Sequence, residues 1–229
     1  AVRAALIVNL LTEDNLPYYT NTIMRMFGAD SVWGAWAKRW TAEEGRHSIV
    51  IRDYLTVTRA VDPVELERDR IAQVSAGMVP EPPNAAEGMA YVALQELATR
   101  ISHRNTGKLL NDGYGYKVMA KVASDENYHF LFYRDLVTAA IKVDPSALVI
   151  AIEAQVRDFE MPGTGIPNFG ERAKMIAKAG IYDLPIHYEQ ILMPVVMRDW
   201  GVAQLEGLTA EGEQARIALI SRIERLGKV

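Results

Sequence analysis

Hydrophobic side chains recur at steps of three and four residues along most of the chain, which is the spacing of one face of an α-helix. This pattern predicts helices over about residues 1–27, 32–59, 63–76, 85–111, 115–142, 145–160, 169–180, 183–199 and 209–226. Pro and Gly cluster at residues 77–83 and 161–170, where they predict loops rather than linkers between domains. The sequence therefore predicts a single all-α domain over residues 1–229.

Two of the predicted helices carry the same pair of residues. Glu44 and His47 lie in the segment WTAEEGRH, and Glu126 and His129 lie in SDENYH. Three residues turn a helix by about 300°, so both side chains of a pair leave the same face. The chain has four histidines, and two of them follow a glutamate at this spacing, which is more than ordinary glutamate usage would produce.

The helix before each pair has one glutamate on its apolar stripe. These residues are Glu13 and Glu96, and each precedes the glutamate of the following pair, Glu44 or Glu126, by nearly the same length of chain. Each half of the chain is thus a helix with one acid followed by a helix with Glu-x-x-His. Di-iron carboxylate bundles use this arrangement, in which two helices give a Glu-x-x-His and two others give one Glu each.

Four glutamates directed into an apolar bundle would cost much free energy if they were ionised and unpaired. Two divalent cations would balance these charges, and carboxylate with imidazole suits non-haem iron, with manganese or zinc as substitutes. Six protein ligands leave coordination positions open on two metal ions, which implies oxygen binding if the metal is iron. The predicted metal ligands are Glu13, Glu44, His47, Glu96, Glu126 and His129.

Polar residues near these positions also have ordinary explanations. Thr99 lies one turn after Glu96, and a hydroxyl bonded to its own helix is the simpler interpretation. His103 is interpreted as a core histidine or as a residue behind the ligands, and His187 as structural. Asp125 directly precedes Glu126 and could accept the spare ring N–H of a metal-bound histidine.

The first two helices carry further expectations. Pro17 removes a backbone hydrogen bond one turn after Glu13, so a kink is expected there. Asp14 points about 100° away from the apolar stripe and is expected to be exposed. The stripe of the second helix is expected to form a deep interior face through its three tryptophans, Trp33, Trp36 and Trp40.

Composition excludes several functions. The absence of cysteine excludes disulfides, thiolate metal sites and cysteine nucleophiles. No apolar run approaches the ~18 residues of a membrane span. The net charge of −4 argues against a nucleic-acid binder.

At these residues the chain resembles the soluble acyl-carrier-protein desaturases, of the plant stearoyl type and their actinobacterial relatives. The resemblance covers nearly all of the chain and is carried by LLTEDNLPYY, WTAEEGRH, LQELATRISHRNTGK and SDENYHFLFYRD. It implies a ferritin-like four-helix bundle with additional helices and two iron ions per chain. The implied ligands are Glu13 and His47 on one iron, Glu96 and His129 on the other, and Glu44 and Glu126 as bridges.

The resemblance also implies that Thr99 takes part in oxygen activation and that Asp125 orients His47 in an electron path. The sequence departs from the family at Gly45, where Asn is frequent, and at Asn127 and Tyr128, where Lys and Arg are frequent. These positions lie between ligands and leave the ligand set intact. The family's N-terminal segment, with the tryptophan that begins its electron path, has no counterpart, so it is expected to be absent here.

The implied activity is O2-dependent desaturation of a fatty acyl chain carried on acyl carrier protein, giving a cis double bond. A ferredoxin-type donor is expected, as are a homodimer and a soluble, cytoplasmic location, or the plastid stroma for a plant protein. Because the chain is acidic, an acidic carrier protein would need a local basic patch. The candidates are Lys38, Arg39, Arg100, Arg104 and Lys108.

Two alternatives stay open beside desaturation. One is another di-iron oxygenase or hydroxylase on the same fold, and the other is a metal-binding homologue without activity. Metal storage in the manner of ferritin is disfavoured by the second Glu-x-x-His and by the length of the chain.

Overall fold

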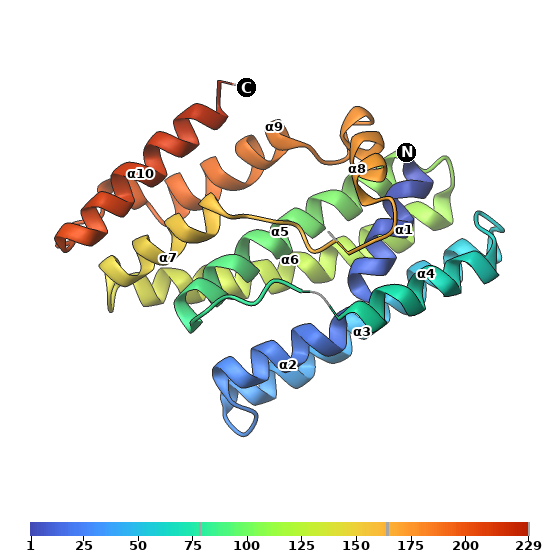
Figure 1. Cartoon of the computed structure of the whole chain (residues 1–229), viewed down its shortest axis with the longest axis horizontal. Helices are drawn as coiled ribbons and strands as arrows, with labels where there is room; N and C mark the ends of the chain where they lie inside the picture. The colour runs from blue at the N-terminus through green and yellow to red at the C-terminus, as the bar shows by residue number, and fades with distance from the viewer. Residues whose placement is uncertain (78, 164, 229) are drawn as a thin grey trace. The chain divides into compact units, whose positions relative to one another are not determined.

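Helices account for every regular element of the computed structural model, which describes residues 1–77, 79–163 and 165–228, and no strand occurs among these residues. In the described residues, no helix is long and apolar enough to cross a bilayer. The elements are α1 (Val2–Glu13), α2 (Leu16–Phe27), α3 (Val32–Val57), α4 (Pro63–Ala76), α5 (Ala85–Leu109), α6 (Gly113–Ile141), α7 (Pro145–Arg157), α8 (Phe169–Lys178), α9 (Leu184–His187), η1 (Tyr188–Asp199), η2 (Val202–Gln204) and α10 (Ala210–Leu226) (Figure 1).

The chain divides into two compact units. The first contains Ala1–Glu81, Thr99–Asp125 and Met161–Ile181, and the second contains Pro82–Ala98, Glu126–Glu160 and Tyr182–Val229. Helices α5 and α6 each contribute one part to the first unit and another part to the second.

The predicted first helix is broken rather than kinked. Helix α1 ends at Glu13, and α2 begins at Leu16 with Pro17 in its first turn. Proline has no amide N–H and is well tolerated in the first turn of a helix, so the chain starts a new helix there. Arg70 of α4 holds Asp14 at this break through contacts of 2.6 and 2.9 Å to its two carboxylate oxygens. The side chain of Asp14 is 6% exposed, so the prediction that it faces solvent is wrong.

Helix α1 packs against α3, α4 and α8 in the first unit. A core cluster there joins α1, α3 and α4 with α6, and its buried residues are Leu6, Leu10, Ile51, Leu55, Leu66 and Met119. A second cluster, between α2 and α3, contains Ile23, Ala37 and Trp40. Trp40 is buried as predicted, whereas Trp33 and Trp36 are half-buried, and Trp33 stacks on Phe27. The predicted interior face is therefore deep only from Trp40 onward.

In the second unit, α7 packs against α10, and α9 leads directly into η1. The predicted helix over 183–199 is a short α-helix followed by a π-helix that contains Pro194. Proline removes a backbone donor and clashes with the carbonyl four residues earlier, and a wider π-turn relieves that clash. The indole N–H of Trp200 then donates to the backbone carbonyl of Arg134 in α6.

Candidate metal centre

Glu13, Glu44 and His47 form a buried trio in the first unit. Glu13 is the last residue of α1, and the other two lie one turn apart in α3. Nδ1 of His47 lies 3.2 Å from Oε2 of Glu44 and 3.8 Å from Oε2 of Glu13. Each residue offers one ligand atom, and these atoms lie within 4.8 Å of one another. Their relative exposures are 7, 5 and 1%, so solvent scarcely reaches the trio.

Glu96, Glu126 and His129 form an equivalent trio in the second unit. Nδ1 of His129 lies 3.3 Å from Oε2 of Glu126 and 3.8 Å from Oε2 of Glu96. These residues also offer ligand atoms within 4.8 Å of one another, and all three are at most 2% exposed. The two halves of the chain thus repeat one arrangement, with one glutamate from one helix and a Glu-x-x-His pair from the next.

The donor set of each trio fits a divalent metal ion. Two carboxylates and one imidazole meet in a buried position, and a protonated imidazole could balance only one of the two negative charges. An unbalanced buried carboxylate is costly, whereas one divalent cation would neutralise both. Oxygen and imidazole nitrogen ligands of this kind suit iron, manganese and zinc.

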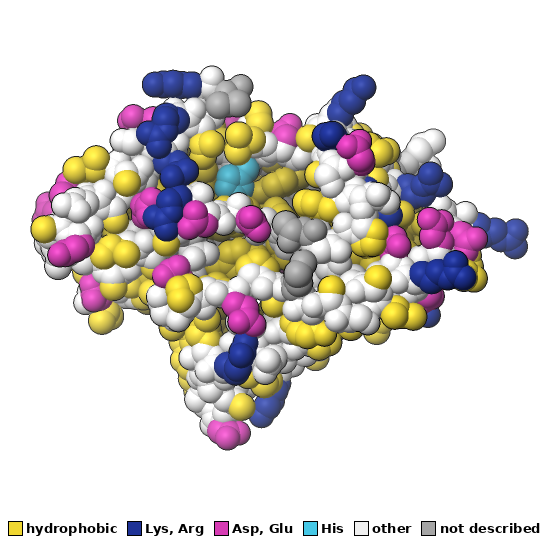
Figure 2. Space-filling view, viewed as in Figure 1, with side chains coloured by type: hydrophobic (Ala, Val, Ile, Leu, Met, Phe, Trp, Pro, Cys, Tyr) yellow, Lys and Arg dark blue, Asp and Glu magenta, His cyan; other side chains and the backbone are white. Residues whose placement is uncertain are grey.

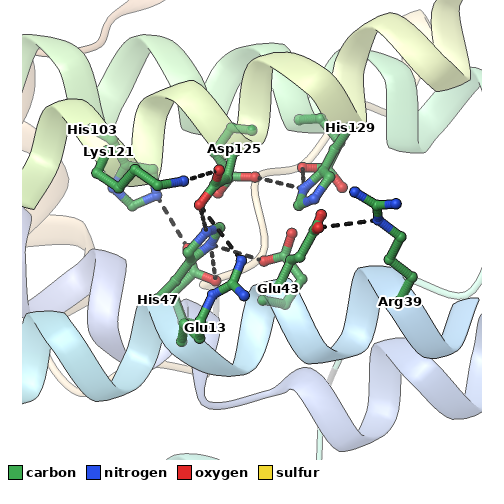
Figure 3. A network of polar contacts seen from close by, with 12 residues as sticks. Glu13, Arg39, Glu43, His47, His103, Lys121, Asp125 and His129 are labelled. Atoms are coloured by element: carbon green, nitrogen blue, oxygen red, sulfur yellow. Dashed lines mark hydrogen bonds and ion pairs between the residues drawn. The ribbon is translucent and has the colours of Figure 1, made fainter.

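The other ring nitrogen of His47 faces Asp125 of α6. Nε2 lies 3.6 Å from Oδ2 of Asp125, which also pairs with Lys121 and lies 4.0 Å from the guanidinium of Arg46 (Figure 3). These residues border a pocket of about 430 Å³ whose apolar wall includes Val50. The His47 ring therefore turns Nδ1 toward the carboxylates of the trio and Nε2 toward a carboxylate beside the pocket.

A third histidine contacts the first trio. Nε2 of His103, in α5, lies 3.1 Å from Oε1 of Glu13, and both side chains are buried. The preceding residue, Ser102, donates a hydrogen bond of 3.3 Å to the side chain of Asn9 in α1. The apolar stripe of α5 indicated that His103 is internal, but no local signal identified Glu13 as its partner.

Two other polar residues singled out in the sequence are also buried. Thr99 lies one turn after Glu96 in α5. The ring of His187 lies against that of Phe159, tilted by 34°, and its Nδ1 lies 2.7 Å from the hydroxyl of Tyr182. Burial lowers the pKa of His187 from 6.5 to about 4, so this imidazole is neutral at pH 7.

Comparison with known proteins decides the family. The model of a family described as fatty acid desaturase matches residues 1–229. The chain belongs to this family. DesA1 of Mycobacterium tuberculosis, a candidate acyl-[acyl-carrier-protein] desaturase, is 44% identical over 232 residues, which cover 98% of this chain and 68% of that protein.

Plant desaturases are more distant relatives. The chloroplastic stearoyl-[acyl-carrier-protein] 9-desaturase 6 of Arabidopsis thaliana is 33% identical over 242 residues, which cover 96% of this chain and 61% of the plant protein. The X-ray structure of DesA2 of M. tuberculosis, a candidate acyl-ACP desaturase, matches with a TM-score of 0.67 and 26% identity, covering 92% of this chain and 76% of that chain. These matches confirm the family resemblance and the all-α, ferritin-like fold.

Proposed function

We propose that this fatty acid desaturase introduces a cis double bond into a fatty acyl chain carried on acyl carrier protein, using O2. The observation that carries the proposal is the pair of equivalent buried trios, Glu13/Glu44/His47 and Glu96/Glu126/His129, in a chain of this family. The relatives named for acyl-[acyl-carrier-protein] substrates supply the substrate class.

We further propose that the six residues bind two iron ions. Glu13 and His47 would hold one ion and Glu96 and His129 the other, with Glu44 and Glu126 as bridges. When bound, the iron pair supplies the oxidation by O2 that breaks unactivated C–H bonds. Support for this ligand set comes from its charge, because two divalent ions would balance four buried glutamates.

The other residues of the site have proposed supporting roles. Asp125 would accept the Nε2–H of His47 and keep Nδ1 turned toward the metal, as carboxylates behind metal-bound histidines do. The pocket beside Asp125 offers a short route from the surface to this histidine for electrons from a ferredoxin-type donor. Thr99 would supply a hydroxyl for proton transfer during oxygen activation. The homodimer, the single-domain organisation and the cytoplasmic location stay predictions.

The proposal is tested by turnover of the iron-loaded protein with ferredoxin, a ferredoxin reductase, O2 and acyl carrier proteins bearing chains of several lengths. Mass spectrometry is expected to find a product that has lost two hydrogens, and the Glu126→Ala variant is expected to form none. A hydroxylated product would instead identify another oxygenase of this fold. A full iron load without any product would identify a metal-binding homologue that lacks the activity.

A further inference from the structure

Two segments of this acidic chain carry more positive than negative charge, residues 99–124 and residues 214–228. On the face drawn in Figure 2, Lys and Arg side chains gather in a row in the region of α10, with Asp and Glu beside them. Residues 99–124 contain five Lys or Arg and a single acid, Asp112, in a chain of net charge −4. Asp112 is already engaged, since its carboxylate accepts hydrogen bonds from Tyr54 and from two backbone amides.

Three of the five cations follow one another at intervals of four residues along α5. Arg100 is partly buried, while Arg104 and Lys108 are exposed. Among the described residues, no carboxylate forms an ion pair with any of the three. Burial, with a contribution from the neighbouring Arg104, lowers the pKa of Arg100 below its ordinary value, whereas a nearby carboxylate would raise it. These cations therefore present positive charge that the chain itself leaves unbalanced.

Apolar groups accompany the three cations. The guanidinium of Arg104 lies 5.2 Å from the centroid of the Tyr116 ring, which is 38% exposed. Leu109, next to Lys108, is 48% exposed. Arginine and tyrosine beside exposed apolar area are typical of protein interfaces, in which charges on the rim steer the partner. We call Arg100, Arg104, Lys108, Leu109 and Tyr116 the α5 basic surface.

The helix that carries this surface is held firmly within the first unit. A Cβ built on Gly107 would lie 2.9 Å from the Cβ of Met119, so α5 and α6 approach closely there. The side chain of Asn105 donates to the backbone carbonyl of Ile181 at 3.0 Å. A rigid platform of this kind lowers the entropic cost of docking a partner.

We propose that the α5 basic surface docks the acidic face of the acyl carrier protein, an inference that rests on the proposed function. The structure favours this surface over Arg39, another basic candidate, because Arg39 forms an ion pair of 3.2 Å with Glu43 of its own helix. Charge complementarity identifies the partner, because a protein of net charge −4 attracts an acidic partner only through a local positive surface.

The test compares two charge-reversal pairs that change the net charge equally. Arg104→Glu with Lys108→Glu alters the proposed surface, and Arg68→Glu with Lys178→Glu alters exposed cations on α4 and α8 as the matched control. Binding of holo acyl carrier protein without an acyl chain is measured for each pair, together with the KM for stearoyl acyl carrier protein.

The test pair is expected to raise both the dissociation constant and KM at least about tenfold. We expect the control pair to change the dissociation constant and KM by less than about twofold. Salt at ~0.5 M screens the charges and is expected to bring the dissociation constants of the two pairs closer together. Both pairs are expected to bind the same number of Co(II) ions with the same affinity as the wild-type protein, which would show that the metal site is intact.

Unchanged carrier binding by the test pair, or an equal loss in both pairs, overturns the docking assignment. A test pair that loses self-association while retaining carrier binding would assign the surface to contacts between copies, which also overturns it. If the test pair binds the carrier more weakly than the wild-type protein and the control pair, but the wild-type protein forms no product, the docking assignment stands and the proposed desaturation fails.

Discussion

Replacing His103 by leucine tests whether a residue outside the proposed ligand set controls one of the two metal ions. Glu13 is the last residue of α1, where helical hydrogen bonding restrains the backbone least. Its Oε1 faces His103 at 3.1 Å, and its Oε2 faces His47 at 3.8 Å. In this arrangement, the His103 N–H directs one carboxylate oxygen away from the proposed metal position and leaves the other turned toward it.

The expected magnitude follows from this geometry. Loss of a hydrogen bond to a buried charged acceptor costs about 1–3 kcal/mol. Partners of metal ligands typically change metal affinity by about 10- to 100-fold, or about 1.4–2.7 kcal/mol. We therefore expect His103→Leu to lower the affinity for one equivalent of Co(II) by about 10- to 100-fold. The affinity for the other equivalent should change by less than about threefold.

Optical titration of the metal-free protein with Co(II) measures both equivalents without any turnover. His103→Gln retains an N–H donor and is expected to restore most of the affinity. Ser102→Ala removes the adjacent hydrogen bond to Asn9 and serves as the control for helix packing. The reasoning is refuted if His103→Leu binds two equivalents with wild-type affinity, or if Ser102→Ala weakens the same equivalent as much.

Three further predictions concern the ligands, the oxygen step and the response to pH. Glu44→Ala and Glu126→Ala are each expected to lose metal and activity together, and two irons per chain in both variants, by metal analysis, would contradict the bridging roles. Thr99→Val is expected to keep iron but to slow O2-dependent turnover, and an unchanged rate would leave Thr99 with a structural role only. His187 has a pKa of about 4 in the folded chain and 6.5 as its ordinary value, so the unfolded chain binds the extra proton first as pH falls. The free energy of unfolding should therefore be unaffected by His187 above about pH 6.5 and should be lower by about 2 kcal/mol at pH 5, because of proton uptake by this residue in the unfolded chain. Urea unfolding should show a smaller pH 7-to-5 loss in His187→Gln, and equal losses would contradict the linkage.

The sequence alone determined most of the helices and the residues of both trios. Helix α4 has the predicted bounds because its signals are local, with Asp62 and Pro63 at its start and Gly77 after its end. The Glu-x-x-His pairs could likewise be read directly, since residues three apart share a face of any α-helix. The family resemblance rested on four short segments that contain the six predicted ligands, and the match of the fatty acid desaturase model confirmed it.

Tertiary structure decided which groups meet these residues. Arg70 holds Asp14, and His103 faces Glu13, although each pair is far apart in the chain. Periodicity states in which direction a side chain leaves its own helix, but not which side chain of another helix lies there. Packing likewise decided the partial exposure of Trp33 and Trp36, because burial depends on neighbours that a single helix does not specify.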